Sequence, residues 1–404
     1  MHEVNQIYLV ISPYFPKGTS AYFSFVYDQV MSLKRCSDYR IVVVNPDSDE
    51  DYVFDGIDVW GVKVPRFLGG YLPQLVGSLA AWRFLQVLRS HKLDCQRIAV
   101  VHGHLASSAK YCNAVKRVNP HVKTLLQFHD CDPFALLRMS PRFDFFGLKT
   151  CNMFSYHRAQ MEKIDACVAV SRNVGEVAKN FPRQKVHADY EPMMRAMRKC
   201  QRCRPARLQH IIVLHTGVDE RMFNAEARKA HKQDGVFTVG CVGRFIDLKD
   251  QQGLIRALSL IADRLGDWKL ILVGGGKMLP KCKELASDLG IASHVEFVKN
   301  IEHADTAKVY GMLDLFVLPS YFEAFGCVYV EAAACGVPVM ACEGQGIVDI
   351  LNDHPERWVV RRRDPTDLAA KILGYYQNRY AQKLAEPLSI DYHIKRFLKE
   401  IRDF

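Results

Sequence analysis

The chain has 404 residues, of which 49% are hydrophobic and 11% aromatic, and its formal net charge is +10. A chain of this length is too long to fold around one ordinary hydrophobic core, which predicts two domains. No apolar run approaches the ~20 residues of a membrane-spanning helix, which argues against an integral membrane protein. The positive charge favours an anionic partner, but it does not distinguish nucleic acid, phospholipid and nucleotide.

The first apolar run and the cysteines indicate a cytoplasmic protein. Residues 7–11 are too short for the apolar region of a signal peptide, and no basic region precedes them. The 13 cysteines are scattered among apolar residues, which is typical of reduced, buried thiols. Cys200 and Cys203 form the one CxxC motif. With no second pair and no histidine at zinc-finger spacing, we expect no metal there.

Strands and helices alternate through the first half of the chain. Strands are expected at 7–12, 40–45, 98–101, 122–128 and 166–170, and helices at 20–34, 72–89 and 107–118. This alternation predicts a parallel, doubly wound α/β sheet that binds its ligands at the carboxyl ends of the strands. His102, His104 and His129 fall at such ends, so together they indicate a site.

The regular pattern stops in the middle of the chain. Residues 183–210 carry eight basic residues against two acidic ones, a net charge of +6. The polar stretch 224–234 then reads as a linker between domains. We therefore expect an N-terminal domain over 1–223 and a C-terminal domain over 224–384.

The second half restarts the alternation. Strands are expected at 236–242, 268–273, 294–298 and 313–318, and helices at 251–265, 279–289, 304–312 and 327–334. Gly243, Gly275 and Val298 lie at or just after strand ends. The Gly-Gly-Gly-Lys turn at 274–277 fits neither a Walker motif nor GxGxxG. We interpret it as a tight strand-to-helix turn with backbone N–H groups facing a crevice.

The stretch 318–346 carries the strongest functional signal. Gly326 leads into a helix whose first N–H groups suit a phosphate. Glu323 and Glu331 flank that position, and carboxylates beside an anion site are suited to sugar or ribose hydroxyls. The alternative is that both are solvated surface glutamates.

Two cations stand at the end of one strand and the head of the next helix. Arg244 and Lys249 could hold a diphosphate there. The alternative is that they only pair with Asp247 and Asp250.

Four motifs of the second half resemble those of the family 4 retaining glycosyltransferases, which have the GT-B fold. The motifs are HTGVDERMF at 215–223, GRFIDLKD at 243–250, EAFGCVYVE at 323–331 and RRDPTDLAAKI at 362–372. The first half matches more loosely, through the Gly18 loop, VHGHLASSA, FHD and VAVS. The resemblance implies two Rossmann-like domains facing across a cleft. It also implies that the last helix, near 391–404, crosses back so that residues 385–404 pack on the N-terminal domain.

The resemblance also assigns roles to residues. Arg244 and Lys249 would contact the donor diphosphate, Glu323 the sugar hydroxyls and Glu331 the ribose. His129 would lie near the reacting carbon. The Gly18 loop, which lacks the family's paired glycines, would close over the phosphates. The remaining donor-binding positions are Gly243, Gly275, Val298, Ala324, Phe325, Gly326 and Cys327.

The implied activity is transfer of a hexose-type sugar, with retention, from a nucleotide-diphosphate sugar to a glycan or lipid-linked acceptor. It would need no metal or other cofactor and would serve surface polysaccharide or glycolipid biosynthesis. The alternatives are a nucleotide-sugar 2-epimerase and a non-catalytic sugar-nucleotide-binding subunit. Asp130-Cys131-Asp132 matches the metal-binding DxD motif of another glycosyltransferase fold. It lies in the half of the chain expected to bind the acceptor, which argues against a metal site there. No basic strand interleaved with aromatics indicates nucleic-acid binding.

Two stretches suit the inner face of an anionic membrane. Residues 68–92 combine an apolar helix with Arg83, Arg89 and Lys92, and the basic segment 183–210 contains Met193, Met194 and Met197. The alternatives are a core helix with a solvated edge and a soluble loop.

Overall fold

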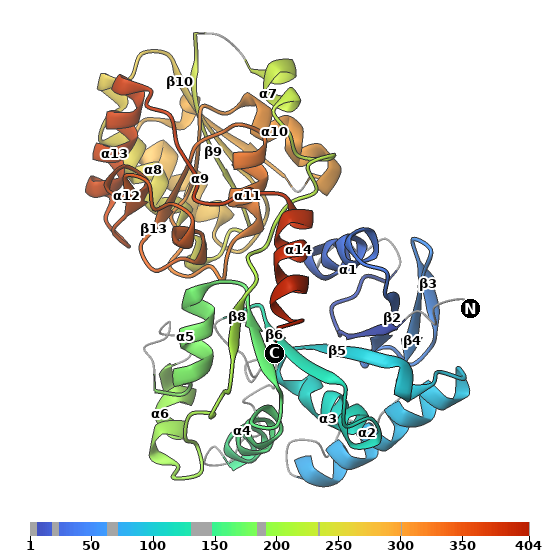
Figure 1. Cartoon of the computed structure of the whole chain (residues 1–404). Helices are drawn as coiled ribbons and strands as arrows, with labels where there is room; N and C mark the ends of the chain where they lie inside the picture. Colours follow the sequence, from blue (N-terminus) through green and yellow to red (C-terminus); the bar gives the residue numbers. More distant parts are fainter. Residues whose placement is uncertain are drawn as a thin grey trace. The chain divides into compact units, whose positions relative to one another are not determined.

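The computed structural model describes residues 6–17, 24–62, 72–130, 148–183, 191–232, 235–299 and 301–403. The chain forms two compact units (Figure 1). Unit 1 comprises Met1–His215 and His393–Phe404, and unit 2 comprises Thr216–Tyr392. The division thus falls earlier than 223/224, and the returning segment starts at 393 rather than 385. The reason is local pairing, because the Val218 N–H donates to Leu388 O (2.9 Å) and the Ile390 N–H to Val218 O (3.0 Å), which joins both segments to unit 2.

Unit 1 is built on a mixed sheet with the order β3-β4-β2-β1-β5-β6-β7-β8, in which β3 alone runs antiparallel among the described strands. Every residue of Ile7–Ile11 is buried, as expected for a central parallel strand covered on both faces. The strands are β1 (Ile7–Ile11), β2 (Arg40–Asn45), β3 (Tyr52–Phe54), β4 (Ile57–Gly61), β5 (Ile98–His104), β6 (Lys123–Phe128), β7 (Ala166–Ala169) and β8 (Ile211–Val213).

The helices of unit 1 begin and end close to the expected residues. Ser171 caps α5 as predicted, since its Oγ accepts from the Val174 N–H at 3.2 Å. From His393 onward the last helix belongs to unit 1, where Lys123 Nζ donates to Ile401 O (2.6 Å) and Arg396 to Val213 O (3.1 Å). The helices are α1 (Ser24–Cys36), α2 (Pro73–Ser90), α3 (Ala109–Val118), α4 (Leu148–Met161), α5 (Arg172–Asn180), α6 (Glu191–Lys199) and α14 (Ile390–Glu400).

Unit 2 holds an all-parallel sheet with the order β11-β10-β9-β12-β13-β14. The strands are β9 (Phe237–Val242), β10 (Trp268–Val273), β11 (Val295–Val298), β12 (Leu315–Leu318), β13 (Val339–Cys342) and β14 (Val359–Val360). The chain winds outward from β9 in one direction and from β12 in the other. The carboxyl ends of β9 and β12 therefore form the point of reversal, where doubly wound sheets bind their ligands.

Helices cover both faces of this second sheet. α8 packs against α9 and α13, whereas α10 packs against α7 and α11. The helices are α7 (Glu226–His231), α8 (Gln251–Ser259), α9 (Leu279–Asp288), α10 (Thr306–Met312), α11 (Cys327–Ala334), α12 (Pro355–Trp358) and α13 (Pro365–Asn378).

Three expected elements differ from the structure. β5 continues to His104 because its second half pairs with both β1 and β6, which places His102 and His104 inside the strand. The helix expected at 251–265 ends at Ser259 and is followed by a short 3-10 helix, Ala262–Arg264. The stretch 224–234, expected as a linker, contains α7, which packs on α10.

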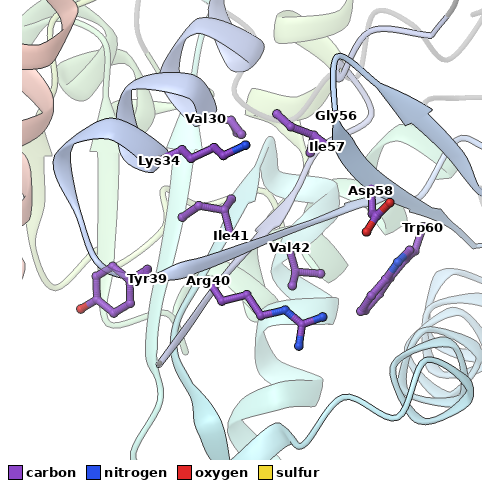
Figure 2. A pocket seen from close by; sticks show the side chains of 10 residues that line it. All are labelled: Val30, Lys34, Tyr39, Arg40, Ile41, Val42, Gly56, Ile57, Asp58 and Trp60. Atoms are coloured by element: carbon purple, nitrogen blue, oxygen red, sulfur yellow. The ribbon is translucent and has the colours of Figure 1, made fainter. Parts of the chain in front are cut away.

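A pocket of about 270 Å³ lies in unit 1, away from the expected site. It opens at the amino ends of β2 and β4, where Figure 2 shows Lys34, Arg40, Asp58 and Trp60 around Ile41 and Val42. Ligands of doubly wound sheets bind at the opposite edge. Gly18, Cys131 and Asp132 lie outside the described residues. Within the described ranges, we find no helix with the length and apolar character needed to cross a bilayer.

Candidate active site

An ion pair joins the two strand ends at the reversal point of unit 2. Lys249 ends a 3-10 turn, Asp247–Lys249, that follows β9, and Glu323 lies in the loop after β12. The Lys249 ammonium donates to the Glu323 carboxylate, and the two side chains are only 17% and 13% exposed. The structure thus brings together two predicted site residues that lie 74 positions apart in sequence.

The Glu323 carboxylate is held through one of its oxygens. Ser320 Oγ donates to Oε1 at 2.7 Å, and Lys249 donates to the same oxygen. Within the described ranges no group is bonded to Oε2, so that oxygen can accept from a hydroxyl group. Gln345 supports the loop, since its side-chain amide donates to Ser320 O at 2.7 Å.

The two aspartates near Arg244 and Lys249 in sequence have other partners. Asp250 caps α8, with its carboxylate accepting from the Gly253 N–H at 3.1 Å. Burial raises its pKa to about 6. Asp247 Oδ2 lies 3.8 Å from Arg363 Nη2. Arg244 is exposed, and in the described part of the chain its guanidinium pairs with neither aspartate. The alternative that Arg244 and Lys249 only pair with these aspartates is therefore wrong.

The predicted backbone positions near β9 and β10 are occupied by sheet bonds. The Gly243 N–H donates to Val273 O and the Gly274 N–H to Val298 O, both at 3.0 Å. Gly275 O accepts from the Phe245 N–H at 2.9 Å. A Cβ at Gly274, where φ is +136°, would lie 2.2 Å from the Gly243 carbonyl oxygen. These positions shape the edge by their small size, because the Gly243 and Gly274 N–H groups are already bonded.

The start of α11 is built from the loop that carries Glu323. Gly326 is its N-cap with φ +87°, and a Cβ there would lie 2.6 Å from the Tyr329 ring. Glycine has no side chain that could accept from the first-turn N–H groups, which begin at Cys327. Ala324 and Phe325 pass so close to Gly346 that a Cβ on Gly346 would lie 1.9 Å from Ala324 O. This close approach fixes the path of the loop into the helix.

Glu331 is a buried carboxylate rather than a surface one. It is 7% exposed, and its Oε2 accepts from the Tyr310 hydroxyl at 2.7 Å. Its Oε1 lies 3.2 Å from His303 Nε2. These contacts exclude the alternative of a solvated helix-surface glutamate. Each carboxylate oxygen keeps a second lone pair that could accept a ligand hydroxyl.

Three predicted histidines meet at the carboxyl side of β5 and β6 in unit 1. His102 Nδ1 lies 2.7 Å from the Tyr8 hydroxyl, and His104 Nδ1 lies 2.7 Å from His129 Nε2. The His102 and His104 rings stack at 4.8 Å, and those of His104 and His129 at 5.0 Å. Burial lowers the pKa of His102 and of His129 to about 3, and it holds that of His104 well below its usual range. All three imidazoles are neutral at physiological pH.

Four side chains that fix this geometry were not predicted, namely Ser320, Gln345, His303 and Tyr310. Ser320 bonds Glu323 within one loop, Gln345 bonds the Ser320 carbonyl, and His303 and Tyr310 bond Glu331 from outside α11. The local sequence of each has no motif that would indicate the contact. His104 was predicted near His129, but only the register of β5 with β6 shows that they are bonded.

Family models match both halves of the chain. Residues 24–190 match "Glycosyltransferase Family 4", and residues 223–389 match "Glycosyl transferases group 1". The chain belongs to the family 4 glycosyltransferases. These matches confirm the family resemblance of the motifs in the second half of the chain.

Two curated relatives match about two fifths to one half of the chain. One is a GDP-mannose-dependent alpha-(1-6)-phosphatidylinositol monomannoside mannosyltransferase of Mycolicibacterium smegmatis, 35% identical over 41% of this chain and 45% of the relative. The other is a D-inositol 3-phosphate glycosyltransferase of Mycobacterium marinum, 34% identical over 50% of this chain and 44% of the relative. The chain thus spans less than half the length of these relatives.

A solved structure matches the whole chain. Sucrose-phosphate synthase from Thermosynechococcus elongatus superposes with a TM-score of 0.66 over 99% of both chains, at 18% identity. At that identity the likeness concerns the fold alone. It confirms the expected GT-B fold class.

Proposed function

We propose that this glycosyltransferase moves a hexose-type sugar, with retention, from a nucleotide-diphosphate sugar to a glycan or lipid-linked acceptor. The observation that carries the proposal is the Lys249–Glu323 pair at the reversal point of the second sheet, with Glu331 on α11, the helix that follows this loop. A cation for a diphosphate and two carboxylates for hydroxyls match the chemistry of a nucleotide sugar. Unit 2 would bind this donor, and unit 1 the acceptor.

The charges of the site suit departure of a diphosphate. In the reaction, the bond between the anomeric carbon and the phosphate oxygen breaks, and its electron pair stays on the oxygen. Arg244, Lys249 and the start of α11 at Gly326 would stabilise that negative charge. In other transferases magnesium or manganese stabilises this charge. Because the groups named above supply that stabilisation here, we propose that this enzyme requires no divalent metal. The ammonium of Lys249 has three protons, and its bond to Glu323 leaves two for phosphate oxygens.

The acceptor oxygen would attack the face from which the phosphate leaves, which retains the configuration. Its proton would pass to the departing phosphate. Glu323 then positions the sugar through its second oxygen rather than acting as a nucleophile. His129, a neutral imidazole bonded to His104, would lie near the reacting carbon. A neutral ring can hydrogen-bond a sugar hydroxyl without opposing the positive charge that develops on the sugar.

A lipid-linked acceptor at a membrane surface is supported by helix α2. Four apolar side chains, three on α2 and one at its N-cap, point outward at spacings of three and four residues, which places them on one stripe. They are Leu72 (48% exposed), Leu75 (65%), Leu79 (39%) and Trp82 (53%). Arg83 and Arg89 are exposed on the same helix. The core contacts are made by other residues, such as Phe84 and Leu88, so burial of α2 does not explain the stripe.

The second expected membrane segment is supported less well. Met194 and Met197 are fully buried in unit 1, so they cannot insert into lipid. Arg195, Arg198, Lys199 and Arg202 remain exposed and could contact anionic headgroups. The names of the mycobacterial relatives mention GDP-mannose, phosphatidylinositol monomannoside and inositol phosphate. They support a hexose donor and an inositol-type or lipid-linked acceptor, in surface polysaccharide or glycolipid biosynthesis.

Mass spectrometry of products tests the proposal. The full chain is incubated with a panel of nucleotide sugars and with glycan and phosphoinositide acceptors. We expect one donor to give an acceptor heavier by one sugar, with release of its nucleoside diphosphate, and no such product from Glu323→Gln. Inversion of the donor sugar at C2 without transfer, detected by NMR because the epimers have equal mass, would indicate the epimerase alternative. Binding of donors with no turnover would indicate the non-catalytic subunit.

A further inference from the structure

Three cysteines from separate parts of unit 1 converge on one point. Cys151 lies on α4, whereas Cys200 and Cys203 flank the turn that follows α6. Their three sulfur atoms lie within 4.8 Å of one another. Sequence spacing showed only the CxxC pair, and the structure adds a third sulfur from a distant helix.

The CxxC turn presents its two sulfurs on the same side. The Cys203 N–H donates to Cys200 O at 2.9 Å, and the Cys200 N–H donates to Met197 O at 3.0 Å. Cys151 and Cys203 are buried and Cys200 is partly buried. An ion held by the three sulfurs would therefore be shielded from water on most sides.

Contacts other than the cysteines hold α4 against this segment. Ser155, one turn after Cys151, donates to Arg202 O at 3.4 Å. Just after the end of the helix, Glu162 accepts from Arg204 Nη1 at 2.9 Å and from the Arg207 N–H at 3.1 Å. These bonds set the register between α4 and the CxxC turn. The sulfurs are therefore placed together by the fold and not by chance overlap of mobile side chains.

We propose that Cys151, Cys200 and Cys203 bind one zinc ion, which ties the basic segment after α6 to helix α4. Zinc–thiolate bonds of about 2.3 Å in a tetrahedron place sulfurs about 3.8 Å apart, a distance that small side-chain rotations reach from the observed cluster. Thiolates select zinc over magnesium or manganese. On binding, each thiol gives up its proton, so three protons leave for one zinc that enters, and water completes the tetrahedron. The exposed cations Arg198, Lys199 and Arg202 flank the turn and suit the net negative charge of three thiolates around one divalent ion.

This zinc is structural and does not depend on the proposed transfer reaction. It lies in the segment that leads from α6 to β8, where the described residues 200–210 form neither helix nor strand. A metal link at this point would replace the packing that regular structure supplies elsewhere. Its loss would loosen the basic segment while leaving the site residues of unit 2 in place.

Metal content of the full chain tests the proposal. The protein is purified through a tag that binds no metal, and zinc is measured by plasma mass spectrometry. We expect about one zinc per chain in the wild type, and none in Cys151→Ser or Cys203→Ser. Cys282→Ser, which alters a buried cysteine of α9 in unit 2, is the matched control and should keep the zinc.

A second measurement covers the case in which the variants do not fold. A thiol-specific mercurial is titrated into the wild-type protein while a chelating dye reports released zinc. Zinc should leave as the cluster thiols react. Cobalt exchanged into the site should give the intense near-ultraviolet absorption of thiolate-to-cobalt charge transfer.

Two outcomes would overturn the proposal. One is a wild-type zinc content equal to that of the Cys151→Ser/Cys203→Ser double variant. The other is a disulfide between two of these cysteines in peptide mapping of the unreduced protein. Neither outcome bears on sugar transfer, which is measured separately.

Discussion

The carboxyl edges of the two sheets carry different chemistry. In unit 2 the groups at the edge are charged, with Lys249 paired to Glu323 and Glu331 bonded to Tyr310 and His303. In unit 1 the groups are His102, His104 and His129, which burial keeps neutral. The two sheet edges therefore hold clusters of side chains of different character. We infer that charge serves the diphosphate in unit 2 and that neutral hydrogen-bonding groups serve the sugar and acceptor in unit 1.

The largest expected effect follows from removal of the charged pair. Lys249→Ala and Glu323→Gln should each lower kcat by about 10²–10³, the usual cost of losing one group that stabilises the transition state. Initial rates at saturating donor provide the measurement. Lys269→Ala removes a half-buried lysine of unit 2 that pairs with Glu296, and it should leave the rate unchanged.

The double variant Lys249→Ala/Glu323→Gln separates catalysis from stability. Lys249→Ala alone leaves a partly buried carboxylate without its cation, which lowers stability. The double variant should regain part of that stability without regaining activity. Near-wild-type turnover in any of these variants would remove the pair from the site.

A smaller effect is expected when Glu331 loses its charge or its support. Glu331→Gln should raise the donor KM about 10-fold or more, since hydrogen bonds to charged groups contribute about 1.5–3 kcal/mol. Tyr310→Phe should raise the donor KM less, because this change removes only one hydrogen bond that orients the Glu331 carboxylate. Tyr375→Phe also removes a buried hydroxyl that donates to a backbone oxygen of unit 2, and it should leave the donor KM unchanged. Equal KM values for all three variants would show that Glu331 does not touch the donor.

Vesicle binding should depend on unit 1. Leu75→Gln/Trp82→Gln should weaken pelleting with anionic vesicles several-fold, because two exposed apolar side chains lose their favourable transfer into lipid. Changing Arg195, Arg198, Lys199 and Arg202 to Gln should also weaken binding and reduce its sensitivity to salt. Lys308→Gln, an exposed lysine of unit 2, is the charge control. Equal pelleting with neutral vesicles, or none with anionic ones, would point to a soluble acceptor.

Acid should affect the two units in opposite directions. His102 and His129 have a pKa lowered from 6.5 to about 3, so between these values the unfolded chain binds more protons and unit 1 loses stability as pH falls. Asp250 has a pKa raised from 3.8 to about 6, so its contribution to the stability of unit 2 increases as pH falls through that window.

Hydrogen exchange measured by mass spectrometry at pH 7 and pH 5, corrected for the intrinsic pH dependence, distinguishes the units. The opening free energy of amides in β5 and β6 should decrease at pH 5, and that of amides in β9 and β12 should not. A decrease confined to unit 2 would contradict the neutral state of the histidines.

The smallest expected effect is that of chelation. Because Arg244 and Lys249 supply positive charge, the transfer rate should be the same without added divalent metal, with magnesium or manganese, and after brief treatment with EDTA. If chelation abolishes activity and magnesium or manganese restores it, Asp130 and Asp132 would again be candidates for a metal site.

The sequence predicted the elements of unit 2 well because its strands are short, apolar and separated by strong turn signals. β10 and α11 begin and end at the predicted residues. Arg244, Lys249 and Glu323 were recognisable because charged residues just after strand ends are conspicuous in an otherwise apolar pattern, and Glu331 because it lies on the helix that follows. The partner contacts were not predictable, since His303, Tyr310 and Ser320 act through bonds that only the packed structure defines.

Unit 1 was harder to predict for two physical reasons. The strand β5 runs on through His102 and His104, and polar residues inside a strand resemble a strand end in sequence. Neutral histidines also leave no charge pattern, because their state depends on burial. The cluster of Cys151 with Cys200 and Cys203 was missed for a related reason, since nothing in the CxxC spacing points to a helix far away in the chain.

Calorimetric titration with a nucleoside diphosphate tests the contrast between the two edges most directly. Wild-type protein is titrated with UDP and with GDP. The titration with the nucleotide that binds is then repeated on the Arg244→Ala/Lys249→Ala double variant and on His129→Ala. We expect the double variant to lose binding and His129→Ala to keep the wild-type affinity. Loss of binding in His129→Ala, with normal binding in the double variant, would contradict the assignment of the donor diphosphate to unit 2.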